Sequence, residues 1–528
     1  MKLTRILRVF SLALSGIQFL ISNGQDFSVS IQGVSIENLY GVQSYAWAQH
    51  DGKWLILGGR TDGLHKRQPN QSFDQAGQHN AVLVIDPVGK QFWTSSIATL
   101  PVGIREQLQS TNMQFYQEGE HLYLTGGYGY SITAANHITY PYITAVNVPN
   151  LIQSVIQQGA IQGHFRQKTD SVFAVTGGYL NQLEGVYHLT GGHQFTGRYN
   201  PMGGPSYVQT YTEADRKFSI QDDGVNWTIT HYGEDKDPLA FHRRDYNVVP
   251  QIFPGEKPGL IAFSGVFQVG ADLPFLDAVL IDSSGHQMST NFSQYYQQYH
   301  CAHLPMYSSM NQKTSTLFFG GIAQYFDSAG ILVQDNAVPF VKTISKVTLD
   351  GNGTLSEYRL GVEMPGFLGA SAEFIPQPDL PIFANEVVDY DQLQGDSVLL
   401  GYVFGGINST QKNIFFINTG IESSANPNLY AIYLHPGVNT GLANPLSNNG
   451  LALQAYPNPS KGKLTVQFQG QENEVATIRV KDLLGKEIYS SCVPCHSGLQ
   501  NHEMNFTAFG SHEVLFVEVE IGARKGAL

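Results

Sequence analysis

The stretch LILGG at residues 55–59 decides the fold, because an apolar strand ending in a pair of small residues recurs six times along the chain. The copies are residues 55–59 (LILGG), 122–127 (LYLTGG), 186–192 (VYHLTGG), 261–265 (IAFSG), 317–321 (LFFGG) and 402–406 (YVFGG). A recurring unit of this kind predicts one propeller blade for each copy. The pairs begin at residues 58, 126, 191, 264, 320 and 405, so the spacing exceeds the roughly 40–50 residues that four strands need, and we expect long loops.

A second apolar run follows each pair and often closes on an Asp turn. These runs are residues 81–90 (AVLVIDPVGK), 142–148 (YITAVNV), 275–285 (FLDAVLIDSSG), 344–353 (ISKVTLDGNG) and 429–437 (LYAIYLHPG), with 207–220 as a weaker third counterpart. Short β-branched and aromatic runs between Gly, Asp and Asn turns indicate strands, and no intervening segment has a convincing helical period. The sequence therefore predicts an all-β domain over residues 25–440.

The sixth unit has a third strand but no obvious fourth. The N-terminal run FSVSIQGV, residues 27–34, alternates as a strand does and is expected to supply it. Pairing the first strand with the last blade leaves no open sheet edge.

This order of strands resembles the Kelch repeat over residues 27–437, with Trp93 and Trp227 where that family places an aromatic residue on the fourth strand. The resemblance implies a six-bladed Kelch-like β-propeller. A residue without Cβ can take positive φ where strands crowd near the central channel, so the glycines of the pairs are expected to be structural. They are Gly58, Gly59, Gly126, Gly127, Gly191, Gly192, Gly265, Gly320, Gly321, Gly405 and Gly406.

A polar linker at residues 441–453 leads to a different pattern over residues 454–528, where alternating strands and tight turns predict a small antiparallel β-sandwich. This part resembles the type A C-terminal sorting domain of the type IX secretion system of Bacteroidetes. The entry motif is Tyr456, Pro457, Asn458, Pro459 and Gly462, and the central turn carries Asp482, Leu483, Gly485 and Lys486. The family usually ends in a Gly-Tyr strand and a basic strand, whereas this chain ends in GARKGAL, so we expect a shortened last strand that weakens sorting.

The N-terminus predicts export. Residues 1–24 combine Lys2, Arg5 and Arg8 with a short apolar run and a small or polar end, as a secretory signal peptide does. No stretch approaches 18 consecutive apolar residues, and the net charge of −13 argues against a nucleic-acid partner. We expect a secreted or outer-surface protein, without a transmembrane segment, whose sorting domain has the type IX machinery as its partner.

Two short clusters suggest cofactors. Cys492, Cys495 and His496 form the C-x-x-C-H pattern of haem c attachment, but they lie in a presumed hairpin without a helical cradle. His300, Cys301 and His303 contain metal-ligating groups, but no second cluster completes a site of four ligands. We therefore predict no cofactor and no metal.

Cationic residues recur just before the first strand of successive units, namely Arg105, Arg166, Arg243, Arg244 and His300. In Kelch-like propellers this loop opens at the channel mouth, which suggests a shallow cationic site for a carboxylated glycan or acidic peptide. The alternative is that these residues are scattered loop charges, or that the arginines are hydrogen-bonded to neighbouring carbonyls. We expect a module that binds a glycan or a protein and does no chemistry.

Two further functions stay open at this point. The first is a carbohydrate-active enzyme, an epimerase, lyase or hydrolase, since Kelch-like relatives include a sialic acid epimerase, and its catalytic residues are unknown. The second is a structural or adhesion protein, favoured if long loops plug the channel mouth.

Overall fold

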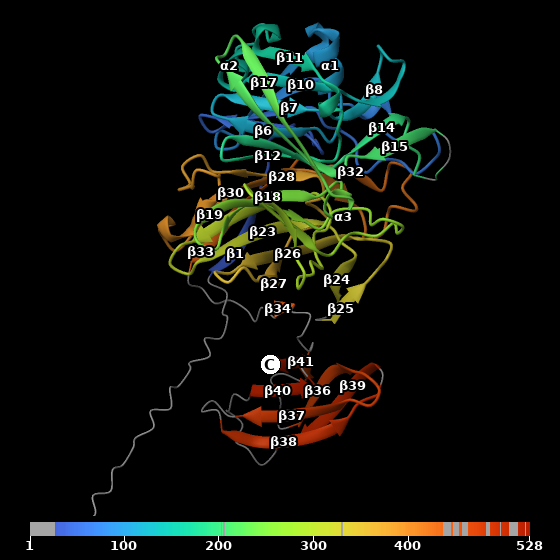
Figure 1. Cartoon of the computed structure of the whole chain (residues 1–528), viewed down its shortest axis with the longest axis vertical. Helices are drawn as coiled ribbons and strands as arrows, with labels where there is room; N and C mark the ends of the chain where they lie inside the picture. The colour runs from blue at the N-terminus through green and yellow to red at the C-terminus, as the bar shows by residue number, and fades with distance from the viewer. Residues whose placement is uncertain are drawn as a thin grey trace, which may run out of the picture.

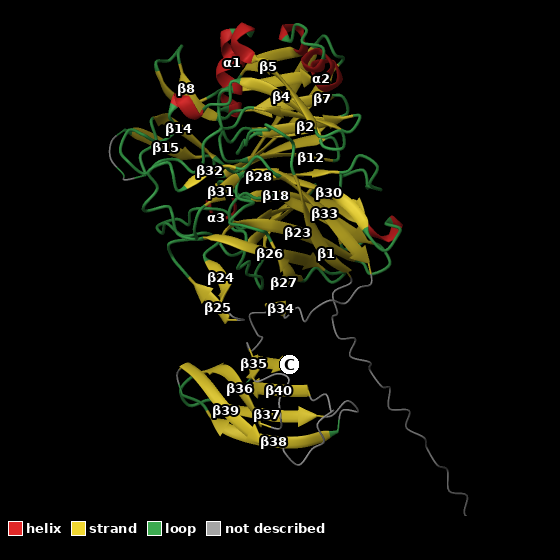
Figure 2. Ribbon diagram, turned by 180° about the vertical axis from the view of Figure 1, so that it is seen from behind, coloured by secondary structure: helices red, strands yellow, loops and turns green. Residues whose placement is uncertain are grey.

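The computed structural model describes residues 27–201, 203, 206–328, 331–436, 445–446, 453–456, 463–481, 486–496, 498–505, 516–522 and 524–527. Strands dominate this part of the chain, and the few helices are short (Figure 2). The α-helices are α1 (Val102–Leu108), α2 (Val148–Ile156) and α3 (Pro238–Phe241), and the 3-10 helices are η1 (Gln75–Gly77), η2 (Ile97–Thr99), η3 (Gln162–His164), η4 (Ser171–Phe173) and η5 (Tyr390–Gln392). The predicted signal peptide lies outside the described residues.

Within residues 27–436, six main sheets follow one another along the chain, and the four main strands of each pair antiparallel (Figure 1). Sheet 1 contains β2 (Ala46–His50), β3 (Lys53–Leu57), β4 (Ala81–Asp86) and β5 (Gln91–Ser96). Sheet 2 contains β6 (Gln114–Glu118), β7 (His121–Thr125), β10 (Tyr142–Asn147) and β11 (Phe165–Thr169). Sheet 3 contains β12 (Tyr179–Leu183), β13 (Val186–Thr190), β16 (Ala214–Asp222) and β17 (Trp227–Lys236).

The other three sheets repeat this order. Sheet 4 contains β18 (Asn247–Phe253), β19 (Lys257–Phe263), β20 (Ala278–Asp282) and β21 (Gly285–Met288). Sheet 5 contains β22 (His303–Ser308), β23 (Lys313–Ile322), β26 (Phe340–Leu349) and β27 (Leu355–Glu363), flanked by β29 (Val388–Asp389) and β34 (Pro445–Leu446). Sheet 6 contains β28 (Ala372–Pro376), β30 (Val398–Gly405), β33 (Leu429–Pro436) and β1 (Phe27–Val34).

The N-terminal strand closes sheet 6 as the sequence predicts. β1 pairs antiparallel with β33 along its whole length, from Phe27 opposite Pro436 to Val34 opposite Leu429. The two predicted tryptophans also lie on fourth strands, Trp93 on β5 and Trp227 on β17. The first and last described segments of this part are therefore joined by a full strand ladder.

Each seam between neighbouring sheets has its own apolar core. Successive side chains of one strand enter different seams, because side chains alternate across a strand. On β3, Leu55 and Leu57 pack toward sheet 2, whereas Trp54 and Ile56 pack toward sheet 6. Separate clusters fill the seams between sheets 2 and 3, 3 and 4, 4 and 5, and 5 and 6. The packing therefore runs from sheet 1 through sheet 6 and back to sheet 1.

The loops that follow the small-residue pairs build accessory strands, which project to one side of the six sheets (Figure 1). One accessory sheet contains β8 (Tyr128–Ser131), β9 (Asn136–Thr139), β14 (His193–Gly197) and β15 (Tyr207–Tyr211). Two hairpins contain β24 (Tyr325–Ser328) with β25 (Ile331–Gln334), and β31 (Ile407–Ser409) with β32 (Ser423–Ala425). We call this side the loop side.

The sequence pattern does not predict the short helices. α2 begins where the Asn147 side chain accepts a hydrogen bond from the backbone N–H of Asn150, and Pro149 lies in its first turn. Its apolar face, including Leu151 and Val155, packs into the core between sheets 1 and 2. A helix of nine residues is too short to show a clear period in a sequence rich in strands.

The C-terminal part is also all-β. One sheet contains β35 (Leu453–Tyr456), β36 (Lys463–Gly470) and β39 (Gly498–Asn505), and the other contains β38 (Glu487–Pro494), β37 (Val475–Lys481), β40 (Phe516–Ile521) and β41 (Arg524–Ala527). Val466, Phe468, Ile478 and Val519 belong to one apolar core. The last strand is β41, which pairs with β40. Its shortening relative to the family stays a prediction.

Candidate functional site

A closed ring of backbone hydrogen bonds joins the six sheets where their first strands begin. Each N–H donates to the carbonyl of the corresponding residue in the preceding sheet, at 2.7–3.2 Å, and the first residue donates to the last. The six residues, which we call the inner ring, are Ser44, Asn112, Gly177, Asp245, His300 and Ser371. All of them except His300 have φ between 50 and 63°. Small, Asn and Asp residues tolerate this left-handed conformation, which explains the residue types.

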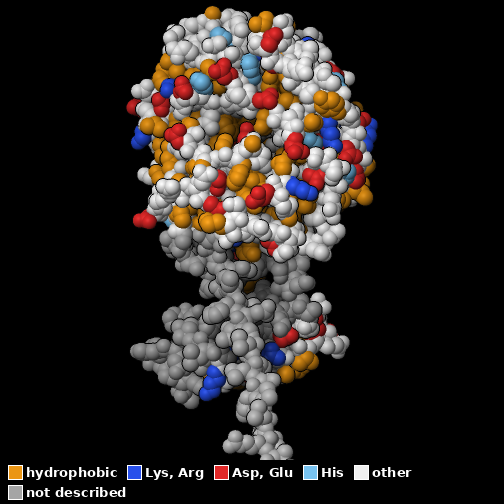
Figure 3. All heavy atoms as spheres, turned by 60° about the vertical axis from the view of Figure 1, so that its left-hand side comes forward, with side chains coloured by type: hydrophobic (Ala, Val, Ile, Leu, Met, Phe, Trp, Pro, Cys, Tyr) orange, Lys and Arg blue, Asp and Glu red, His pale blue; other side chains and the backbone are white. Residues whose placement is uncertain are grey.

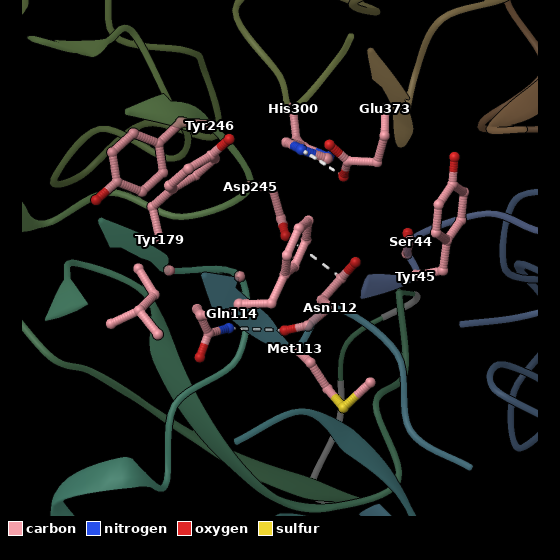
Figure 4. A pocket seen from close by; sticks show the side chains of 14 residues that line it. Ser44, Tyr45, Asn112, Met113, Gln114, Tyr179, Asp245, Tyr246, His300 and Glu373 are labelled. Atoms are coloured by element: carbon pink, nitrogen blue, oxygen red, sulfur yellow. Dashed lines mark hydrogen bonds and ion pairs between the residues drawn. The ribbon is translucent and has the colours of Figure 1, made fainter. Parts of the chain in front are cut away.

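The inner ring borders a partly enclosed cavity, which we call the central cavity. It is small, with a volume of about 40 Å³, and its lining residues come from the first strand of each of the six sheets or from the residues that lead into that strand. Figure 4 shows Asp245, His300 and Glu373 around this space, with Tyr45 and Tyr179 on its walls. Six sheets that diverge in sequence thus place polar and aromatic side chains around one small volume.

Glu373 and His300 form the charged pair of the central cavity. The His300 Nε2 lies 3.2 Å from Glu373 Oε1, and the Glu373 residue is only 4% exposed. Apart from this contact with His300, Glu373 Oε1 has no hydrogen-bond partner among the described residues. Burial lowers the pKa of His300, but the negative charges of Glu373 and Asp245 outweigh burial, so its pKa is raised overall.

The tyrosines of the cavity are neutral donors. Burial, and next the Glu373 charge, raise the pKa of both Tyr45 and Tyr179 well above the usual range. The Tyr45 hydroxyl donates to the Phe404 carbonyl at 3.0 Å, which fixes the ring. The Tyr179 hydroxyl lies 3.4 Å from His303 Nε2 and so links sheets 3 and 5.

His303 is a neutral acceptor in this contact. Burial lowers its pKa to about 4. Its Nδ1 lies 3.0 Å from the Cys301 carbonyl, which can only accept, so Nδ1 carries the proton and Nε2 accepts from Tyr179. The pair positions the Tyr179 ring at the cavity wall.

The inner-ring residue Asp245 forms an ion pair with its neighbour Arg244. The Arg244 Nη1 donates to Asp245 Oδ2 at 2.5 Å, and the Arg244 Nε donates to the Tyr211 hydroxyl at 3.3 Å. The guanidinium also lies over the Phe267 ring, 4.9 Å from its centroid. Arg244 therefore faces the accessory strands of the loop side.

The segment 377–397 between β28 and β30 crosses the space at the far ends of the first strands. β29 pairs parallel with β22 of sheet 5, and the Asn385 amide donates to the Gln251 carbonyl of sheet 4 at 3.0 Å. Glu386 is hydrogen-bonded to Tyr116 of sheet 2. A single segment of sheet 6 thus reaches three other sheets, on the side away from the inner ring.

The small-residue pairs supply a second closed set of contacts. The N–H of the last glycine of each pair donates to a carbonyl in the segment that enters the next sheet, at 2.7–3.1 Å. The donors are Gly59, Gly127, Gly192, Gly265, Gly321 and Gly406. All eleven predicted glycines have positive φ.

Two of the predicted cationic residues lie on peripheral elements. Arg105 is on α1 and donates to the Ala98 carbonyl at 3.2 Å. Arg166 is on β11, the last strand of sheet 2, and forms a bidentate ion pair with Asp222 at 2.6 and 2.7 Å. Their donors are directed to these partners rather than to the central cavity.

The other three predicted cations lie near the inner ring, in different surroundings. Arg243 is fully buried, and its guanidinium donates to the Ala240 and Ser264 carbonyls and to the Asp277 carboxylate. Arg244 faces the loop side, and His300 lines the central cavity. The predicted cationic site of these five residues remains a prediction.

The sequence reasoning missed Tyr45, Tyr179 and Glu373. A usable signal exists for three sheets, because Ser44, Asn112 and Gly177 each precede the last glycine of their pair by 15 residues. Longer hairpins and loops hide the same relation in the other three sheets, where the offset is 20 to 35 residues. Only the closed hydrogen-bond ring reveals that all six positions are equivalent.

The candidate metal ligands and the candidate haem-attachment residues differ in burial. Cys301 is fully buried beside Asn247, and in the described ranges no group of three or more His, Cys, Asp or Glu side chains could hold a metal ion. Cys492 is exposed on β38, whereas Cys495 is buried and His496 is exposed. The expected absence of haem remains a prediction.

The described part of the chain contains no helix long and apolar enough to cross a membrane. On the face that Figure 3 shows, acidic side chains are scattered over the upper body rather than gathered in one patch. This agrees with the negative net charge of −13.

Residues 454–511 match the family model described as the secretion system C-terminal sorting domain. Tyr456 of the predicted motif lies on β35, and Pro457, Asn458, Pro459 and Gly462 lie outside the described residues. No curated protein matches the chain. The solved structure of YjhT is similar with a TM-score of 0.42 and 11% identity, covering 76% of this chain and 100% of that chain. The sorting domain establishes export through the type IX secretion system to the cell surface or the extracellular space.

Proposed function

We propose that residues 27–436 are a six-bladed Kelch-like β-propeller that serves, at the cell surface or outside the cell, as a binding module for a glycan or a protein. The six sheets are the blades, and β1 completes the last one. The two closed sets of six hydrogen bonds and the six apolar seams support this arrangement, because each returns from sheet 6 to sheet 1.

The observation that carries the binding function is the central cavity. Its partly enclosed volume combines a buried carboxylate, a histidine and tyrosine rings contributed by different sheets. Concave sites with a few convergent polar groups and aromatic walls are typical of ligand binding. The accessory strands of the loop side add further surface beside it.

A carbohydrate-active enzyme is the second candidate. The pair of His300 and Glu373 could move a proton, and the protonated Tyr179 hydroxyl borders the same space. A structural or adhesion role is the third, and the segment 377–397 favours it by crossing the far side of the channel.

The test is a binding screen of the full chain against arrays of neutral, acidic and amino-sugar glycans and of peptides, with product formation followed by NMR. Binding without turnover that is lost in Glu373→Gln supports the module, and turnover supports the enzyme. Glu256→Gln, at an exposed carboxylate, is the matched control. If the folded chain binds no glycan or peptide, the binding function is wrong and the structural role gains support.

A further inference from the structure

We propose that the central cavity recognises a protonated primary amine, which Glu373 binds through its carboxylate while the tyrosine walls surround the ammonium group. This inference deepens the proposed binding function and rests on it. The chemistry named is the ammonium group itself, which an amino sugar or a lysine side chain can supply.

The Glu373 carboxylate is buried and only partly paired. Glu373 is only 4% exposed, and it lines the central cavity. Among the described residues its carboxylate pairs with His300 alone, whose Nε2 lies 3.2 Å from Oε1, and Oε1 has no further hydrogen-bond partner. A buried carboxylate with a single partner still has unused acceptor positions, so the site favours a ligand that brings further N–H donors and positive charge.

Aromatic rings form part of the walls of the central cavity. The rings of Tyr45, Phe115 and Tyr179 line the cavity. Burial keeps the two phenols protonated, so they add hydroxyl dipoles and ring faces rather than negative charge. Aromatic faces attract ammonium groups, and this attraction strengthens when water is excluded.

Few cationic side chains border the central cavity. Among the described residues that line the cavity there is no Lys or Arg, and the nearby Arg244 is paired with Asp245 on the loop side. An anionic ligand would meet Glu373 with only His300 to oppose its charge. The cavity therefore prefers a cation over an anion.

His300 makes the affinity depend on pH. Its protonated form neutralises Glu373 and competes with the ligand, and Glu373 and Asp245 raise its pKa against the effect of burial. His303 stays neutral because burial lowers its pKa to about 4. Amine affinity should therefore rise as the pH increases through the raised pKa of His300. Burial raises the pKa of Glu386, on the crossing segment near Tyr179, to about 7, so this carboxylate adds negative charge only as the pH rises above that value.

The experiment measures ligand binding to the full chain by saturation-transfer NMR and titration calorimetry at pH 6 to 9. The probes are matched pairs, namely glucosamine with N-acetylglucosamine, and Nα-acetyl-lysine amide with its Nε-acetylated form. Methylammonium tests the charged group alone. The lysine side chain has a pKa near 10.4 and stays protonated over this range, so the pH profile is measured with the lysine derivative.

We expect both amines to bind and their acetylated forms to bind at least about tenfold more weakly, since a hydrogen bond to a charged group is worth roughly 1.5–3 kcal/mol. Glu373→Gln should cost about tenfold in affinity, and Glu256→Gln should cost nothing. His300→Gln should retain amine binding at pH 6 and flatten the pH profile. A preference for glucosamine or for the lysine derivative identifies the source of the amine.

Equal binding of the amines and their acetylated forms would overturn the inference, as would unchanged amine affinity in Glu373→Gln or no amine signal at pH 8. If Glu373→Gln fails to fold, the paired ligands and the His300→Gln profile still decide. Binding of neutral glycans with no amine preference would overturn this inference while leaving the proposed binding function intact.

Discussion

Replacing Gly59 by Ala should destabilise residues 27–436 strongly. Gly59 has a φ of 82°, and a Cβ built there would lie 2.5 Å from the Gln43 carbonyl oxygen and 2.9 Å from the Tyr45 Cβ. Its N–H also donates to the Ser110 carbonyl at 2.8 Å, one of the six bonds that link successive sheets. The substitution therefore adds a strained backbone conformation, a steric clash and a threatened hydrogen bond.

The magnitude follows from these three contributions. Left-handed backbone for Ala costs about 1–2 kcal/mol. Overpacking against backbone costs about 1–3 kcal/mol. Loss of a buried backbone hydrogen bond costs about 1–3 kcal/mol. Together they predict a loss of roughly 3–8 kcal/mol in the free energy of unfolding, with the upper end reached only if nothing relaxes.

The matched control is Gly119→Ala. Gly119 has a φ of 56°, but a Cβ there would meet no atom within 4 Å, so only the backbone cost of about 1–2 kcal/mol remains. Urea unfolding followed by tryptophan fluorescence isolates the relevant part, because all four tryptophans lie between residues 47 and 227. Equal losses of stability in the two variants would refute the close-approach explanation of the glycine pairs.

Two further predictions concern titration and thiol reactivity. His286 lies 2.9 Å from Asp235 and 3.0 Å from Asp237, and although burial lowers its pKa, hydrogen bonds to these carboxylates raise it overall. Its stabilising contribution should be complete below the unfolded pKa of about 6.5 and be lost as the pH rises through the higher folded pKa. Urea midpoints between pH 5.5 and 8.5 should therefore fall less steeply in His286→Gln than in the parent, and parallel profiles would contradict this origin. Cys492 is the one exposed cysteine, so an aromatic disulfide reagent should titrate one thiol in the folded chain and three after denaturation, and rapid reaction of a second thiol would contradict the burial of the other two.

Three features of the chain show what the local sequence pattern can and cannot predict. The run at residues 27–34 alternates clearly, and the structure pairs it with β33 as predicted. The helix α2 escaped prediction because nine residues between strands carry too few turns to reveal a period. The cationic residues before the first strands share a sequence position, but their side chains take different directions. Arg166 pairs with Asp222 at the periphery, and Arg243 is buried against carbonyls.

The sequence by itself determined the all-β class, the strand that closes the last sheet, the glycine pairs and the sorting domain, because each depends on residues close together in the chain or on a short motif. Only the tertiary structure decided that the inner ring closes, and that Glu373 and His300, 73 residues apart, meet at 3.2 Å in one cavity. The physical reason is that loops of different lengths place equivalent positions of six sheets around one centre. The chemistry of the cavity depends on that convergence and on the burial that accompanies it.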